Sequence, residues 1–391
     1  MAQPKNLAFV KPELLVWARE DAGYTIDEAA RKIAVKPEKL AACEVGNDKL
    51  TVNQLRSLSN AYKRPFAFFY LPTPPRTEIS LQDFRHFTDE DEHRLKPLLR
   101  VEIRKAKGRR EIALNMLEEL DQEPEVFVSF ASADENVQVI GQRIRELLNV
   151  SFERQVRLRS DYEALRFWRN SIEARGVLTF QASVPKSEMR GFSMWFSPLP
   201  IIVVNAKDSP YGRVFTMLHE LTHLMLRSGG LCDLGEDKIE VFCNAVAGET
   251  LVPSEMLLQE RLVRDNGNDR VWTDETLIIL AGRYGVSREV ILRRLLTLDR
   301  TTQEFYRQKR TEWMQAFESA RDKESASGGF APPPVKALSA VGPTFAGLVL
   351  ECYNQERISP VDAAQYLGVK IKHLSTIEKA VKIPSLTSEA A

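Results

Sequence analysis

The sequence predicts a multidomain, mainly α-helical protein that contains one small β-sheet. At 391 residues the chain is long enough for about two to three domains with a sizeable core. Apolar residues recur at helical spacing along most of it, whereas three short runs rich in β-branched and aromatic residues are typical of strands. These runs directly precede a helix with two regularly spaced histidines, so we expect an α+β core between helical segments.

Composition excludes some classes of protein. Lysine and arginine together number 54, as do aspartate and glutamate, so no global attraction to polyanions is expected. The four cysteines form no C-x-x-C pair, which favours reduced thiols and a cytoplasmic location. No targeting pattern opens the chain, and the longest apolar run, near 199–204, is too short to span a bilayer. We therefore expect no membrane partner.

The first segment, 1–70, is predicted to be a bundle of short helices. Helices are expected at 12–22, 26–33, 37–44 and 52–62. The stretch TIDEAARKIAVKPEKLAACEVGNDKLTVNQLRSLSNAYKRP resembles the Cro/repressor-type (XRE) helix-turn-helix domain. That resemblance implies a five-helix fold in which the second helix of the pair enters the major groove of DNA.

Two interpretations of this segment stay open. The residues that would lead into the groove are Lys36, Glu38 and Lys39, a face poor in side chains that read bases. The first 75 residues carry eleven basic and eight acidic side chains, a weak footprint for phosphate binding. The segment either binds DNA or serves as a docking or homodimerisation module.

A connector is predicted at 71–150. It begins with proline-rich sequence and contains a long basic helix at 94–120. Arginines of this helix could contact phosphates, but glutamates are interleaved with them, so a solvated face with ion pairs is the alternative.

The next segment, 151–310, is predicted to hold the sheet and the chemistry. A helix is expected at 162–175 and strands at 177–183, 191–196 and 200–206. A helix and a small sheet therefore precede the histidine-bearing helix. One edge of such a sheet could bind an extended peptide as an additional strand.

The central motif is HELTH, an H-E-x-x-H pattern. Ser209 and Pro210 are a helix start signal, so His219 and His223, four residues apart, lie on one face and can bind one metal ion together. Glu220 lies where a carboxylate can accept a proton from a metal-bound water. The alternative to a metal site is that the two histidines are ordinary surface or core residues of an amphipathic helix.

A catalytic zinc needs a third protein ligand, and Glu240 is the next candidate. Spacing alone leaves it open whether Glu240 is a ligand or forms a capping box with Asp237. Asn244 lies one turn further on and could hydrogen-bond a ligand from the outer shell. Tyr211 is a candidate donor to the oxyanion of the tetrahedral intermediate, with helix-start packing as the alternative.

FTMLHELTHLML followed by IEVFCNAVAGETLVP resembles the signature of the ImmA/IrrE-type zinc peptidases. The resemblance implies a gluzincin-like fold, one Zn²⁺ per chain held by His219, His223 and Glu240, and Glu220 as general base. It further implies a regulator that cleaves a protein, commonly a helix-turn-helix repressor, in stress response, mobile-element control or defence. Glu249 and Thr250 depart from the family pattern, which has small or apolar residues there.

The remaining sequence predicts more helices. We expect one helix at 254–263, two at 273–298 joined at Gly285–Ser287, a flexible loop at 322–334, and a helical C-terminal extension over 311–391. Cys232, between the two metal-site helices, is either an inhibitory zinc ligand or a plain thiol.

Two other functions stay open. The protein could be a DNA-binding transcriptional regulator whose metal site is sensory or structural, or a non-catalytic component of a toxin–antitoxin or defence system. The intact Glu220 argues against the second, because a purely structural zinc site does not need this carboxylate. The first would be recognised by binding to the gene's own promoter, with a salt dependence that reflects few phosphate contacts.

Overall fold

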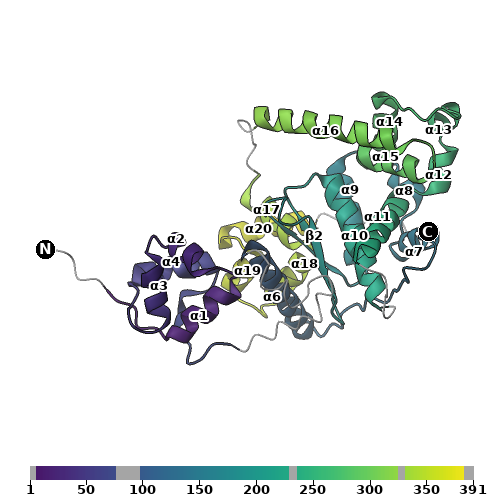
Figure 1. The fold of residues 1–391 in the computed structure, drawn as a ribbon. Coiled ribbons are helices and arrows are strands. Elements are labelled where there is room, and N and C mark those ends of the chain that lie inside the picture. Colours follow the sequence, from purple (N-terminus) through teal and green to yellow (C-terminus); the bar gives the residue numbers. More distant parts are fainter. Residues whose placement is uncertain (1–5, 76–96, 229–235, 325–330, 383–391) are drawn as a thin grey trace. The chain divides into compact units, whose positions relative to one another are not determined.

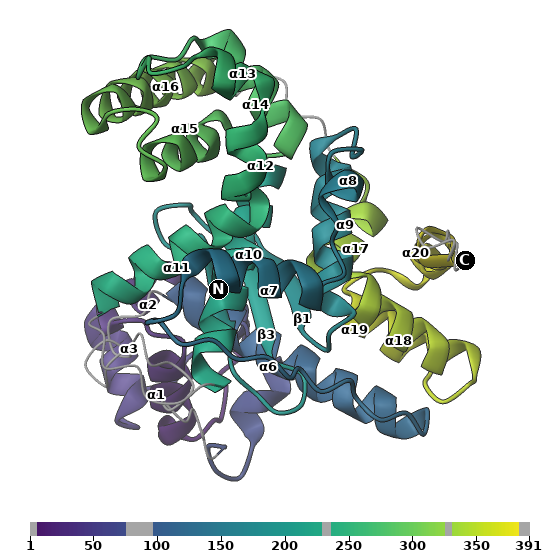
Figure 2. The same ribbon diagram turned by 90° about the vertical axis from the view of Figure 1, so that its right-hand side faces the viewer.

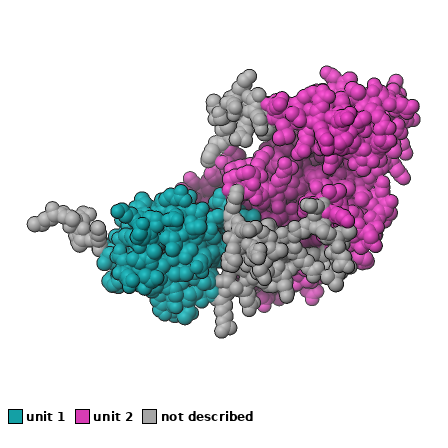
Figure 3. All heavy atoms as spheres, in the orientation of Figure 1, with its two compact units in different colours: residues 1–108 teal, residues 109–391 magenta. Residues whose placement is uncertain are grey.

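The computed structural model describes residues 6–75, 97–228, 236–324 and 331–382. These residues are mostly helical and contain one three-stranded sheet (Figure 1). The chain divides into two compact units, Met1–Gly108 and Arg109–Ala391 (Figure 3). Among the described residues no single helix has the length and apolar composition to cross a membrane, although the bent pair Pro333–Val341 and Pro343–Asn354 passes that test jointly.

The first unit contains a small helical core. Capping boxes begin two of its helices, at Thr25 with Glu28 and at Thr51 with Gln54. Arg19 donates hydrogen bonds to both carboxylate oxygens of the buried Glu44, at 2.9 and 3.0 Å, and thereby joins the first and third helices. The sequence predicted five helices; the structure has a 3-10 helix as the fifth element: α1 Pro12–Asp21, α2 Ile26–Lys32, α3 Pro37–Glu44, α4 Val52–Tyr62 and η1 Phe66–Tyr70.

The long basic helix predicted at 94–120 is α6, Pro97–Glu119, and the boundary between the units lies within it. In the first unit Arg104 donates to Asp21 Oδ2 at 2.5 Å and to the carbonyl of Tyr62 at 2.9 Å. In the second unit Arg110 donates to the carbonyl of Pro198 at 2.7 Å. These two arginines therefore bind protein groups, which favours the ion-pair interpretation over phosphate contacts.

The sheet of the second unit has the order β1-β3-β2. Strand β1 (Leu178–Ala182) runs parallel to β3 (Ile201–Asn205), and β2 (Gly191–Met194) runs antiparallel to β3. Helices cover it on both faces: Ile202 and Val204 belong to the core that includes the apolar side of the histidine-bearing helix, whereas Phe180 packs edge-on against Phe345. The outer strands are thus β1, against which a C-terminal helix packs, and β2.

In the second unit α11 packs against both α10 and α7, and α10 also packs against α9 and the sheet (Figures 1 and 2). Its core reaches back to Phe127, so it begins before residue 151, where the sequence placed the domain start. The helices up to the histidine-bearing pair are α7 Val137–Leu147, α8 Phe152–Gln155, α9 Asp161–Glu173, α10 Pro210–Ser228 and α11 Glu236–Leu251. Those that follow are α12 Ser254–Gln259, α13 Arg261–Asp265, α14 Asp274–Tyr284, α15 Arg288–Thr297 and α16 Gln303–Glu324.

The prediction of one helix at 254–263 was wrong. The chain is extended at Glu260, with φ −59° and ψ 132°, which separates α12 from α13. The Glu260 carboxylate accepts a hydrogen bond from Arg283 at 2.5 Å, so a tertiary contact accompanies the break. The pair predicted at 273–298 is confirmed as α14 and α15, with Gly285 ending the first helix.

The C-terminal segment is helical, as predicted. Its elements are α17 Pro333–Val341, α18 Pro343–Asn354, α19 Pro360–Leu367, η3 Ile371–His373 and α20 Leu374–Lys382. The predicted loop at 322–334 is shorter than expected, because α16 extends through Glu324 and α17 begins at Pro333, a residue favoured at the first helical position. Residues 325–330 of that loop lie outside the described chain.

Gly342, between α17 and α18, lies where this segment packs against α9. It has φ +87°, and a Cβ there would collide with Arg169 Nη2 and Glu173 Oε1. Arg169 and Glu173 form a buried ion pair, and each also binds the C-terminal segment: Arg169 donates to the carbonyl of Ser339 at 2.7 Å, and Glu173 accepts from the Thr344 N–H at 3.0 Å. The extension is therefore part of the second unit's packing.

A buried ion pair explains the departure from the family pattern at Glu249. Its carboxylate pairs with Arg294 of α15 and accepts hydrogen bonds from the N–H and hydroxyl of Ser254, at 2.8 and 2.6 Å. Both charged side chains are buried, at 6% and 4% exposure. Burial lowers the pKa of the Arg294 guanidinium. The negative charge of Glu249 acts in the opposite direction and raises that pKa, but burial has the larger effect.

We predict that Glu249→Ala destabilises the second unit by about 3–5 kcal/mol, because it leaves the Arg294 charge buried without a partner. Urea unfolding followed by tryptophan fluorescence would measure the loss. Replacing both residues by leucine and methionine should recover most of the stability, since neither charge then remains buried. A single variant as stable as the parent chain would contradict this account of the pair.

Candidate metal centre

Helix α10 presents the two histidines on one side. The Ser209 hydroxyl accepts a hydrogen bond from the Gly212 N–H at 3.1 Å, which caps the helix ahead of Pro210 as the sequence predicted. Val214, Leu218, Leu221 and Met225 are fully buried, so the orientation of the helix is fixed by its apolar face. The Nε2 atoms of His219 and His223 are 3.0 Å apart, as expected for residues one turn apart.

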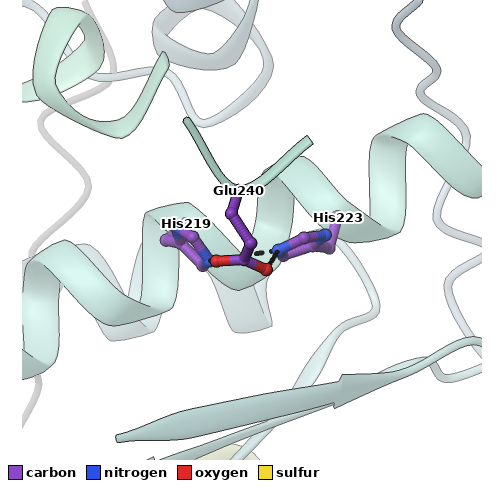
Figure 4. Close-up of side chains that lie close together, drawn as sticks. All are labelled: His219, His223 and Glu240. Atoms are coloured by element: carbon purple, nitrogen blue, oxygen red, sulfur yellow. Dashed lines mark hydrogen bonds and ion pairs between the residues drawn. The ribbon is translucent and has the colours of Figure 1, made fainter. Parts of the chain in front are cut away.

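Helix α11 brings Glu240 to these histidines. Cys243 and Ala247, three and seven residues further on, are completely buried, and Glu240 extends their side of α11 to the surface, where its side chain is 49% exposed. Its Oε2 lies 3.3 Å from His219 Nε2 and its Oε1 lies 3.1 Å from His223 Nε2 (Figure 4). Because α11 begins at Glu236, Asp237 is already inside the helix, and the geometry favours the ligand interpretation of Glu240 over the capping box.

The donor set fits a zinc ion. One ligand atom from each of the three side chains lies within 4.8 Å of the others. Two ligands bound to zinc at about 2.05 Å in tetrahedral geometry are separated by about 3.3 Å, close to the observed 3.0, 3.1 and 3.3 Å. Two imidazoles and one carboxylate also match the ligands of catalytic zinc sites, which leave the fourth position open.

Electrostatics at the centre favour an ionised carboxylate. Hydrogen bonds from His219 and His223 hold the pKa of the Glu240 carboxyl far below its ordinary value. Burial alone lowers the pKa of the His219 imidazole, but the hydrogen bond to Glu240 and the charges of Glu220 and Glu240 raise it above its ordinary value of 6.5. Both shifts indicate that the centre stabilises positive charge.

Glu220 lies between α10 and strand β2, and Ser193 of that strand donates a hydrogen bond to Glu220 Oε2 at 2.8 Å. A Cβ at Gly191 would lie 3.2 Å from Glu220 Oε1 and collide with Thr216. Neither Ser193 nor Gly191 is marked as a site residue by the sequence. The alternation in GFSMWF places 191 and 193 on one face, but which helix residue lies opposite depends on packing.

Two further site residues predicted from the sequence, Asn244 and Tyr211, differ in their distance from the candidate ligands. Asn244 lies close enough to His219 to contribute to the raised pKa of its imidazole, whereas His219 Nδ1 has no hydrogen-bond partner among the described residues, so an orienting role for Asn244 stays a prediction. Tyr211 is two helical turns, about 12 Å, from His219, and its ring lies near Gly285. The structure does not bring Tyr211 to the ligands, which favours a packing role.

The candidate DNA-reading side chains lie on α3 of the first unit. Lys36 precedes the helix and is exposed, as is Glu38, whereas Lys39 is partly buried and lies 3.7 Å from Asp48. A surface with so few free basic side chains offers little for the phosphates of a nucleic acid to bind. DNA binding by the first unit therefore stays a prediction. Cys232 lies outside the described residues, so its proximity to the ligands stays open.

Comparison with known proteins identifies part of the chain. Residues 172–296 match a peptidase family model described as the IrrE N-terminal-like domain, a family generally composed of metallopeptidases. The matched range contains the sheet, α10, α11 and the four residues of the centre. No curated protein matches the chain. The second unit thus contains a domain similar to a metallopeptidase, whereas the match does not extend to the first unit.

We predict about one zinc per chain, and a loss of affinity of more than about 100-fold in Glu240→Ala, because removing a ligand costs more than removing an outer-shell partner. Mass spectrometry of the metal-loaded protein and competition with a chromophoric chelator would measure both. Lys238→Ala is the matched control, since Lys238 is exposed on the same helix. Equal zinc affinity in Glu240→Ala and in the control would exclude Glu240 as a ligand.

Zinc affinity should fall as the pH decreases through the pKa of His219, which is raised above 6.5 in the metal-free protein. The metal needs neutral imidazoles, so a protonated His219 competes with it, whereas Glu240 stays ionised throughout this range. Chelator competition at a series of pH values between about 8 and about 5.5 would test this. An affinity independent of pH over that interval would show that His219 is not a ligand.

Proposed function

We propose that this protein is a zinc-dependent endopeptidase of the ImmA/IrrE type. The observation that carries the proposal is the convergence of His219, His223 and Glu240 from two helices, with Glu220 adjacent, within the range that matches the peptidase family. A structural zinc site would need no free carboxylate beside the ligands. Glu220 is such a carboxylate, and it is held by strand β2 rather than by the three candidate ligands.

His219, His223 and Glu240 would hold the zinc. When bound, zinc supplies Lewis-acid polarisation and lowers the pKa of water toward neutrality. Glu220 accepts the proton of the attacking water and transfers it to the leaving amine, the general base and general acid roles of one carboxylate. Its side chain is only 8% exposed, so bulk water does not screen it as it would a surface carboxylate.

Strand β2 is a suitable place for the substrate. It is an outer strand of the sheet, and its Ser193 contacts Glu220 directly. An extended peptide added at this edge would make main-chain hydrogen bonds of the same kind as a strand. The main-chain carbonyls of the bound peptide would then lie close to Glu220, the proposed general base. A flexible segment of a protein substrate fits this geometry better than a folded surface.

The protein substrate that we propose is a helix-turn-helix repressor or similar regulatory protein in the cytoplasm. The first unit supports this class, because its sequence resembles a repressor domain and α2 packs against both α3 and α4 in it. Such a unit can recognise another repressor-like protein by docking. The regulatory setting would be stress response, mobile-element control or defence.

Glu220→Gln tests the enzyme proposal. It should retain about one zinc per chain, because glutamine replaces a residue that is not a ligand, and it should lower kcat by at least about 100-fold, the lower bound for losing a general base. Metal analysis and cleavage of candidate regulators in the host extract would measure the two effects. The inactive variant should also retain the substrate that the wild type cleaves.

Lys238→Ala serves again as control and should cleave at the wild-type rate. Stoichiometric zinc without any substrate cleaved by the wild type or trapped by Glu220→Gln would contradict the peptidase proposal. Unchanged biological function of Glu220→Gln in the host would do so as well.

A further inference from the structure

Strand β2 faces α10 with its two smallest side chains. Gly191 and Ser193 alternate with the buried Phe192 and Met194, so they lie on the same side of the strand. That side meets the stripe of α10 formed by Thr216 and Glu220, which are one turn apart. The carboxylate of Glu220 therefore lies against the strand, between the positions of Gly191 and Ser193.

The two positions play different parts. Gly191 provides room, since a Cβ there would collide with Thr216 Cγ2 and lie 3.2 Å from Glu220 Oε1. Ser193 provides a donor, with its hydroxyl 2.8 Å from Glu220 Oε2. Among the described residues, this is the hydrogen bond that the structure gives the Glu220 carboxylate. Glutamate has several rotatable bonds, so without a partner its carboxylate samples several orientations.

We propose that Ser193 is the positioning residue of Glu220: its hydroxyl holds the carboxylate in the orientation in which it receives the proton. The inference rests on the proposed peptidase function. A donor to one oxygen fixes the plane of the carboxylate and leaves lone pairs of the other oxygen for the proton. Ser193 acts through Glu220, to which its hydroxyl donates.

The location of Ser193 adds a second consequence. It belongs to the outer strand along which the peptide is proposed to lie, so the orientation of the general base is tied to the strand that holds the substrate. A hydroxyl that donates to Glu220 offers a substrate only its acceptor lone pairs. Substrate binding should therefore depend little on Ser193, whereas proton transfer should depend on it strongly.

Ser193→Ala should lower kcat by about 10- to 100-fold, the factor that corresponds to losing a hydrogen bond to a charged group. Its KM should stay within about twofold of the wild type, because the variant removes no substrate contact. Ser193→Thr keeps the hydroxyl and should restore most of kcat. Ser209→Ala is the control: it removes a hydroxyl that caps the same helix but does not contact Glu220, so it should lower thermal stability and leave kcat unchanged.

Readouts that do not depend on turnover complete the test. Zinc content and affinity should be unchanged in Ser193→Ala, whereas binding of a peptide hydroxamate, whose hydroxyl pairs with the general base, should weaken by about tenfold in calorimetry. A crystal structure of the variant should show the Glu220 carboxylate rotated away from its wild-type position. A wild-type kcat with wild-type hydroxamate affinity would overturn the inference, as would a Thr variant as impaired as Ala.

Failure of the peptidase proposal is distinguishable from failure of this inference. If the wild type cleaves nothing, the proposed function fails, and the orientation of Glu220 in the Ser193→Ala crystal structure still decides whether Ser193 positions it. If the wild type cleaves and Ser193→Ala matches it, only the positioning role is lost.

Discussion

The metal centre depends on the close packing of α10 against α11. The two histidines lie on one helix and need no tertiary contact to approach each other, but the third donor comes from the next helix. Small and medium side chains, Cys243, Val246 and Ala247, are completely buried on α11 and let the helices approach closely. Because Glu240 lies at the exposed end of the same side of α11, burial of the apolar residues that follow it brings the carboxylate to the imidazoles. The arrangement of the three candidate ligands thus depends on the hydrophobic packing of the two helices.

Features set by local sequence could be predicted, and those set by tertiary contacts could not. The start of α10 follows from Ser209 and Pro210, and the spacing of His219 and His223 follows from helical periodicity. Glu240 stayed open between two roles, since spacing does not reveal how two helices pack. The break at Glu260 was missed because a contact with Arg283 accompanies it, and the hydrogen bond of Ser193 was missed because it joins a strand to a helix.

Glu249 shows the same limit in another form. The sequence marked it as a departure from the family pattern, without a reason. Its partner Arg294 lies 45 residues further along the chain, and the two charges are acceptable inside the protein only because they meet there. A polar residue at a buried helix position is therefore informative in itself: it signals a partner of opposite charge that pattern alone does not locate.

The docking of α17 and α18 through Gly342 bears on how the protein can be divided experimentally. Arg169 and Glu173 are buried beneath that segment, and both donate or accept across the contact. A truncated chain that keeps the residues matching the peptidase domain but ends before α17 would expose this pair to water and uncover Phe180, whose ring packs on Phe345. The family match and the compact unit therefore have different boundaries, and a fragment that keeps these contacts must be longer than the recognisable domain.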